Sequence, residues 1–129
     1  MRFAIFVSAI LLSGSALAAA PAAPAAPAAG DVARGEKRFK AICGACHTLD
    51  PAKKSIGPHL KGVVGRKAGT VAGFAYSVGM KNSGITWDTA ILDPYLTRPG
   101  NVVKGTKMIN MVANAKDRSD IIAYLATVK

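Results

Sequence analysis

Residues able to bind a metal ion or to form a disulfide network are scarce in this chain, which has two cysteines and two histidines among 129 residues. A structural zinc site needs four ligands, and apart from His47, which follows the second cysteine, the only histidine is His59. Half a zinc site is therefore a weak alternative. The sequence pattern also lacks a regular alternation of strands and helices, which argues against a thioredoxin-like redox dithiol.

Acidic side chains are also scarce, since seven aspartates and glutamates oppose 17 lysines and arginines, and the formal net charge is +10. Three explanations suit such a basic chain: solubility alone, nucleic-acid binding, or electrostatic steering toward an acidic protein partner. Nothing beyond net charge favours nucleic acid. The choice between the other two depends on what the chain binds.

The N-terminal apolar run, residues 3–12, is short for a membrane span of about 20 residues. It follows a basic start and precedes a small-residue cleavage region, an order typical of a secretory signal peptide. We predict cleavage after Ala18, so that residues 1–18 form the signal peptide. An uncleaved membrane anchor is the alternative. Residues 19–29 repeat Pro-Ala-Ala and predict an extended linker, which leaves 30–129 as one domain.

The two cysteines lie in the stretch Cys43-Gly44-Ala45-Cys46-His47. This C-x-x-C-H pattern is typical of a c-type haem attachment site. Each thiol can form a thioether to one vinyl group of a haem, and the adjacent imidazole then lies against the iron as a neutral nitrogen ligand. We predict one covalent haem c per chain and no disulfide. Because thioether attachment takes place on the export side of the membrane, the motif agrees with a periplasmic location.

Helical periodicity predicts a helix at each end of the domain. The first spans residues 31–43 and begins at Asp31, a good N-cap, and Gly35 within it could allow another helix to cross closely. The last begins at Asp117, with Asp120 three positions on as in a capping box. Its apolar face consists of Ile121, Tyr124, Leu125 and Val128. We expect the two helices to pack against each other.

The middle of the domain predicts short helices joined by long loops. Residues 48–73 contain many glycines and prolines, and so long a loop needs an added core such as a haem. A helical turn is expected at 77–82 and a helix at 88–97, bent or split by Pro94. The predicted fold is all-α, with about four to five short helices and long loops wrapped around one covalent haem c.

The sixth ligand of the iron decides what the haem does. A thioether makes it an electron carrier, whereas an open position allows gases or peroxide to bind. The candidates after export are Met80, Met108 and Met111, and their spacing does not choose among them. His59, beside Pro58, is expected at an exposed turn and not at the iron.

The whole domain from about Gly30 to Lys129 resembles the class I mono-haem cytochromes c, the group of mitochondrial cytochrome c and its bacterial periplasmic relatives. The matching stretches run in order along the chain: Gly30-Asp31-Val32, Cys43 to Thr48, Gly57-Pro58-His59-Leu60, Gly65-Arg66-Lys67, Gly73-Phe74-Ala75-Tyr76, Gly84-Ile85-Thr86-Trp87, Tyr95-Leu96, Gly105-Thr106-Lys107-Met108 and Asp120 to Leu125. This is far more specific than the haem motif alone.

The resemblance implies roles for particular residues. It implies His47 and Met108 as axial ligands, with the Pro58 carbonyl accepting from the other ring nitrogen of His47. It places the hydroxyl of Tyr95 near the methionine sulfur. The inner haem propionate would be held by Arg66, Tyr76 and Trp87.

Three positions depart from the family pattern. Lys104 replaces the usual proline before Gly105, which should loosen the methionine loop. Asn110 replaces a frequent aromatic residue, which should expose one haem edge. Met80 stands at a position near the haem where the family usually has a polar residue. There it would make the pocket drier or offer a competing sulfur.

The resemblance implies a one-electron carrier and not an enzyme. Its partners would be acidic docking surfaces on a bc-type quinol–cytochrome reductase and on a terminal oxidase or photosynthetic reaction centre. We expect a monomer, and exposed lysines around the haem edge: Lys40, Lys53, Lys54, Lys67, Lys104 and Lys107. The alternative function is a haem peroxidase or gas-binding protein with a labile methionine.

Overall fold

The computed structural model describes residues 29–129. The predicted signal peptide, 1–18, and all of the predicted linker but Ala29 lie outside these residues. Within the described part the helices are α1 (Val32–Arg38), a π-helical turn η1 (Phe39–Cys43), α2 (Val78–Lys81), α3 (Thr89–Thr97), α4 (Pro99–Val102) and α5 (Ala115–Thr127). No helix of residues 29–129 is long and apolar enough to cross a membrane.

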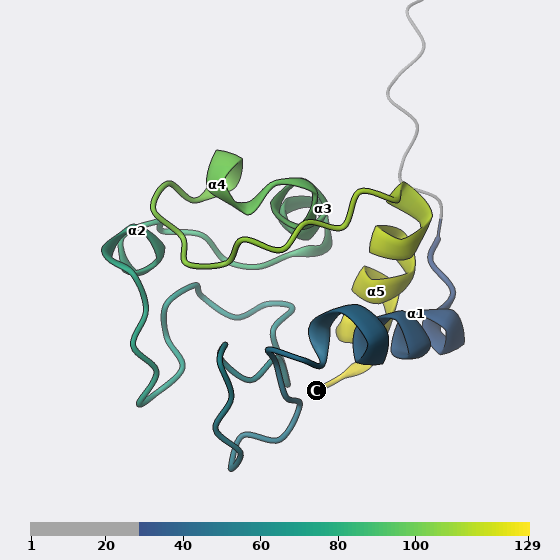
Figure 1. Ribbon diagram of the computed structural model, residues 1–129, viewed down its shortest axis with the longest axis horizontal. Helices are drawn as coiled ribbons and strands as arrows, with labels where there is room; N and C mark the ends of the chain where they lie inside the picture. The colour runs from purple at the N-terminus through teal and green to yellow at the C-terminus, as the bar shows by residue number, and fades with distance from the viewer. Residues whose placement is uncertain (1–28) are drawn as a thin grey trace, which may run out of the picture.

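The all-α expectation is confirmed, since residues 29–129 contain no strand beyond one isolated bridge between Lys67 and Thr86. Figure 1 shows α1 and α5 crossing at one side of the molecule, α2 at the other, and α3 between them. Loops between η1 and α2 make up the part drawn in teal. The core lies where α1, α3 and α5 meet these loops.

The first predicted helix is present, but it changes type before the haem motif. The Asp31 carboxylate accepts from the Arg34 amide at 2.7 Å, which confirms the N-cap. After Arg38 the chain continues as a π turn, closed by the Gly44 amide donating to the Phe39 carbonyl at 2.9 Å. Such π turns often occur at functional sites, and this one ends at Cys43.

Gly35 allows α1 to touch the backbone of α5. A Cβ placed on Gly35 would lie 2.0 Å from the carbonyl oxygen of Asp120 and 2.8 Å from Cβ of Tyr124. Beside this crossing the rings of Phe39 and Tyr124 pack with their centroids 5.7 Å apart. The expected packing of the terminal helices is therefore present, and it leaves no room for a side chain at Gly35.

The start of the last helix differs from the prediction. The N-cap is Asn114, whose side chain accepts from the amide of Asp117 at 3.0 Å, and α5 begins at Ala115. Asp120 is fully buried and does not form a capping box. Its carboxylate accepts from the Arg34 guanidinium, from Lys116 Nζ at 2.7 Å and from the Asp31 amide at 2.7 Å. These donors tie α5 to the start of α1.

Of the bent or split helix predicted at Pro94, the split alternative is wrong, because α3 runs unbroken from Thr89 to Thr97. Pro94 is exposed, and so is Ala90, whose carbonyl loses its helical donor, so water can solvate that carbonyl. On the opposite side Leu92 and Tyr95 are buried. Burial of this apolar face outweighs the lost hydrogen bond.

Candidate functional site

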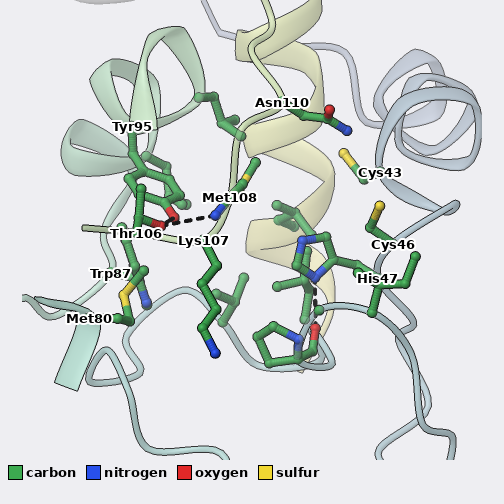
Figure 2. Close-up of a pocket in the computed structure, with 18 of the residues that line it drawn as sticks. Cys43, Cys46, His47, Met80, Trp87, Tyr95, Thr106, Lys107, Met108 and Asn110 are labelled. Atoms are coloured by element: carbon green, nitrogen blue, oxygen red, sulfur yellow. Dashed lines mark hydrogen bonds between the residues drawn. The ribbon is translucent and has the colours of Figure 1, made fainter. Parts of the chain in front are cut away.

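One cavity of about 480 Å³ brings the predicted cofactor-binding residues together. All nine line it: Cys43, Cys46, His47, Pro58, Arg66, Tyr76, Trp87, Tyr95 and Met108. Apolar side chains complete the walls, among them Leu60, Val63, Leu92, Leu96, Ile121 and Leu125. Figure 2 shows Cys43, Cys46 and His47 on one side of this cavity and Tyr95, Thr106 and Met108 on the other.

The ring of His47 is held in one orientation and one tautomer. Its Nδ1 lies 2.8 Å from the Pro58 carbonyl oxygen, as the dashed line in Figure 2 marks. A carbonyl only accepts, so Nδ1 carries the hydrogen and donates it, which leaves Nε2 unprotonated. Burial lowers the pKa of His47, although the hydrogen bond to Pro58 opposes this effect. The ring is therefore neutral at neutral pH, as a metal ligand must be.

Gly57 lies against the ring of His47, a contact that the sequence alone did not indicate. A Cβ placed on Gly57 would lie 2.4 Å from Cε1 and 2.6 Å from Nδ1 of His47. The Gly57 amide also donates to the Cys46 carbonyl at 2.7 Å. The loop that supplies Pro58 is thus bonded directly to the haem motif. The only sequence signal was the glycine immediately before the proline.

Cys43 and Cys46 are free, half-buried thiols whose sulfurs lie on the same side of the cavity (Figure 2). Burial, with a smaller contribution from Cys46, raises the pKa of the Cys43 thiol to about 11. A redox-active or metal-binding cysteine is instead expected to have a lowered pKa. The Cys43 thiol therefore lacks the lowered pKa of a reactive dithiol, which agrees with the choice made from the sequence.

Hydrogen bonds fix the backbone of Met108. The hydroxyls of Tyr95 and Thr106 lie 3.0 Å apart, and Thr106 Oγ1 accepts from the Met108 amide at 3.3 Å. Burial raises the pKa of Tyr95, partly offset by its bond to Thr106, so the phenol stays protonated at neutral pH. Thr106 was not predicted as a site residue, although it lies within the matching stretch Gly105 to Met108.

The other methionines are placed differently. Met80 is buried and lines the same cavity as Trp87. Met111 is 56% exposed and does not line the cavity. The structure thus reduces the three candidate sulfurs to two, Met80 and Met108.

The guanidinium of Arg66 lies at the cavity wall and is held by a loop. It donates to the carbonyls of Lys61 at 3.0 Å and His59 at 2.8 Å. Burial lowers the pKa of Arg66, and Tyr76 opposes this effect. The prediction that His59 is exposed is wrong. Its side chain is half-buried, and Nδ1 is buried with no hydrogen-bond partner among residues 29–129.

Two aromatic residues continue this part of the wall. The Tyr76 hydroxyl accepts from the Val71 amide at 3.3 Å. Trp87 is buried, with its ring centroid 4.7 Å from that of Tyr95. Together with Arg66 they add hydrogen-bond donors and a positive charge to the wall of the cavity.

The donor set of the cavity fits a haem c. Two thiols at the required spacing, an unprotonated imidazole nitrogen and a thioether on the other side of an apolar cavity are the groups that attach such a haem and ligate its iron. A helical fold built around such a cavity defines a mono-haem protein of the c type.

Comparison with known proteins agrees. The family model for cytochrome c matches residues 32–129, so the chain belongs to the cytochrome c family. It is 52% identical to cytochrome c2 of Rhodomicrobium vannielii over 129 residues, which cover 98% of this chain and 94% of the relative. It is 50% identical to cytochrome c2 of Rhodoblastus acidophilus over 103 residues, covering 78% of this chain and 95% of that one.

A solved structure shares the fold. Cytochrome cH from Methylobacterium extorquens superposes with a TM-score of 0.69 and is 50% identical, covering 76% of this chain and 99% of its own. The predicted family, fold class and covalent haem c are thereby confirmed. The chain is an electron carrier and not an enzyme.

Proposed function

We propose that the chain carries single electrons with its haem iron bound by His47 and Met108 in both oxidation states. The observation that supports this most directly is the pair of supports on opposite sides of the cavity. Pro58 fixes the His47 ring at 2.8 Å, and Thr106 fixes the Met108 backbone at 3.3 Å. When bound, the haem c supplies a reversible one-electron Fe(III)/Fe(II) couple.

The protein residues hold this ligand set constant. Cys43 and Cys46 anchor the group covalently, and the unprotonated Nε2 of His47 is available to the iron. The apolar walls exclude water, and a thioether ligand favours the reduced iron. Because the His47 ring and the Met108 backbone are held by hydrogen bonds, these two residues would rearrange little when the charge of a bound haem changes.

We assign the inner haem propionate to the part of the cavity wall that carries Arg66, Tyr76 and Trp87. Arg66 supplies a positive charge, and Tyr76 and Trp87 supply hydrogen-bond donors. All three line the cavity, and Arg66 is already fixed by the carbonyls of Lys61 and His59. A fixed, half-buried cation interacts more strongly with a carboxylate than an exposed one.

We infer transient docking to acidic surfaces of a bc-type quinol–cytochrome reductase and of a terminal oxidase or photosynthetic reaction centre. The six predicted docking lysines are all exposed: Lys40, Lys53, Lys54, Lys67, Lys104 and Lys107. Ile56 and Ile109, 78% and 85% exposed, line the cavity and offer apolar surface for contact with a partner. Rates with such partners should fall as salt is added.

Export to the periplasm, after removal of residues 1–18, and a monomeric state complete the proposal. The C-x-x-C-H motif and the N-terminal sequence pattern support export. Intact mass of the purified protein tests both the loss of 18 residues and the gain of one haem. A mass that retains residues 1–18 would favour an anchored form.

Visible absorption spectra of the oxidised and reduced protein test the ligand set. We expect a low-spin spectrum, a weak sulfur-to-iron band in the oxidised form, and no response of the reduced form to carbon monoxide. Met108→Ala should remove the sulfur band, whereas Met80→Ala should keep it. A high-spin spectrum or ready carbon monoxide binding by the wild type would contradict the proposal and favour a peroxidase or gas-binding protein.

A further inference from the structure

The loop that carries Met108 begins with a tight turn. The Thr106 amide donates to the Val103 carbonyl at 3.2 Å, and Gly105 has a φ of 72°. Val103 is 2% exposed, so the turn begins from the core. The position of this turn decides where Met108 lies, because only Thr106 and Lys107 separate Gly105 from it.

A glycine of α2 touches this turn through its backbone. A Cβ placed on Gly79 would lie 1.9 Å from the Lys104 carbonyl oxygen and 3.1 Å from the carbonyl carbon. Real Cβ atoms do not approach other atoms so closely, and the atoms opposite are backbone. Only the hydrogen of a glycine fits, so α2 rests directly on the turn.

A second contact joins the same two segments on the other side of Thr106. Lys107 Nζ donates to the Ala75 carbonyl at 3.1 Å. The methionine loop is therefore held against residues 75–79 both before and after the residue that fixes Met108. The two segments lie far apart in the sequence, since Lys107 and Ala75 are 32 residues apart.

We propose that Gly79 is a positioning residue for Met108, and that its contact with Lys104 determines how easily the sulfur is displaced from the iron. The inference rests on the proposed ligation by Met108. Lys104 stands where the family usually has a proline, and so the turn lacks the proline ring that would restrict its backbone. The contact with α2 supplies that constraint from outside, together with the Lys107–Ala75 hydrogen bond.

Gly79→Ala in the haem-loaded protein tests the proposal, with Gly100→Ala as its matched control. Both glycines lie in four-residue helices, but a Cβ on Gly100 would meet nothing within 4 Å. We expect Gly79→Ala to bind added imidazole about tenfold more tightly, as expected when overpacking weakens the native arrangement. The sulfur-to-iron band should weaken, and amide exchange at Thr106 and Met108 should accelerate. Gly100→Ala should match the wild type.

Lys107→Ala keeps the test decisive if Gly79→Ala fails to fold, because it removes the second contact without a steric clash. It should shift imidazole affinity and amide exchange in the same direction. Unchanged affinity, band and exchange in Gly79→Ala, or in Lys107→Ala where the first variant does not fold, would overturn the inference. If Met108→Ala has the same spectrum as the wild type, the proposed ligation itself is overturned. The two failures are therefore distinguishable.

Discussion

Nδ1 of His47 donates its hydrogen to the carbonyl oxygen of Pro58 across 2.8 Å, which leaves Nε2 unprotonated in the cavity. The two residues are 11 positions apart and are joined by a loop that also bonds to the haem motif through Gly57 and Cys46. Such a contact to a ligating histidine fixes its tautomer and orientation. It makes the His47 side of the site rigid before any ligand binds.

Gly57→Ala should disturb this arrangement. The added Cβ would lie 2.4 Å from the His47 ring, and relieving such overpacking costs about 1–3 kcal/mol. We expect the free energy of unfolding of the haem-loaded protein, measured with guanidinium, to fall by about that amount. The low-spin fraction should also decrease. Equal stability of Gly57→Ala and wild type would show that the ring does not depend on this contact.

Gly35→Ala distinguishes helix propensity from packing. Propensity alone would stabilise α1 by about 1 kcal/mol. The Cβ would, however, lie 2.0 Å from the Asp120 carbonyl oxygen, and forcing two helices apart costs about 1–3 kcal/mol or more. We expect net destabilisation in a denaturant titration, whereas Gly100→Ala, whose Cβ meets nothing within 4 Å, should be neutral or slightly stabilised. A stabilised Gly35→Ala protein would disprove the tight crossing.

Asp120 should make the free energy of unfolding depend on pH in the acid range. Its bond to Arg34 is the largest cause that lowers its pKa, with further contributions from Lys116 and the Asp31 amide, against an opposing effect of burial. Because the pKa is lower in the folded state than in the unfolded state, the stabilisation is present above the unfolded pKa. It is lost as the pH falls from about 5 toward the folded pKa.

Urea unfolding measured at several pH values tests this linkage. Asp120→Asn should be less stable at pH 7 and should lose less stability on acidification than the wild type. Arg34→Gln removes the main donor and should also flatten the dependence. The same acid slope in all three proteins would mean that this carboxylate is not the linked group.

Lys104→Pro should stabilise the methionine loop. A turn with Gly105 at a φ of 72° as its third residue favours proline at its second. The Lys104 amide forms no hydrogen bond within the described chain, so proline removes no bond there. A compatible proline stabilises by about 0.4–1 kcal/mol. We expect weaker imidazole binding than in the wild type, and tighter binding would show that the turn cannot accept the ring.

Local features were predictable because they depend on neighbouring residues. Asp31 was predicted as an N-cap, and its side chain accepts an amide hydrogen from the residue three positions on, as that of Asp88 does at the start of the helix predicted for 88–97. The same approach failed for α5, where Asn114 lies a few residues before the chosen Asp117. Asp120 suited a capping box, but its partner Arg34 lies 86 positions away. No local rule identifies such a partner.

The sequence by itself determined the attachment chemistry, since the two thiols and His47 lie within five consecutive residues. It also determined the helical class through capping and periodicity. Only the tertiary structure decided that Met111 lies outside the cavity, that His47 presents Nε2 to it, and that Gly79 touches Lys104. The reason is physical: each of these facts depends on how segments remote in sequence pack, and close packing is set by the whole fold.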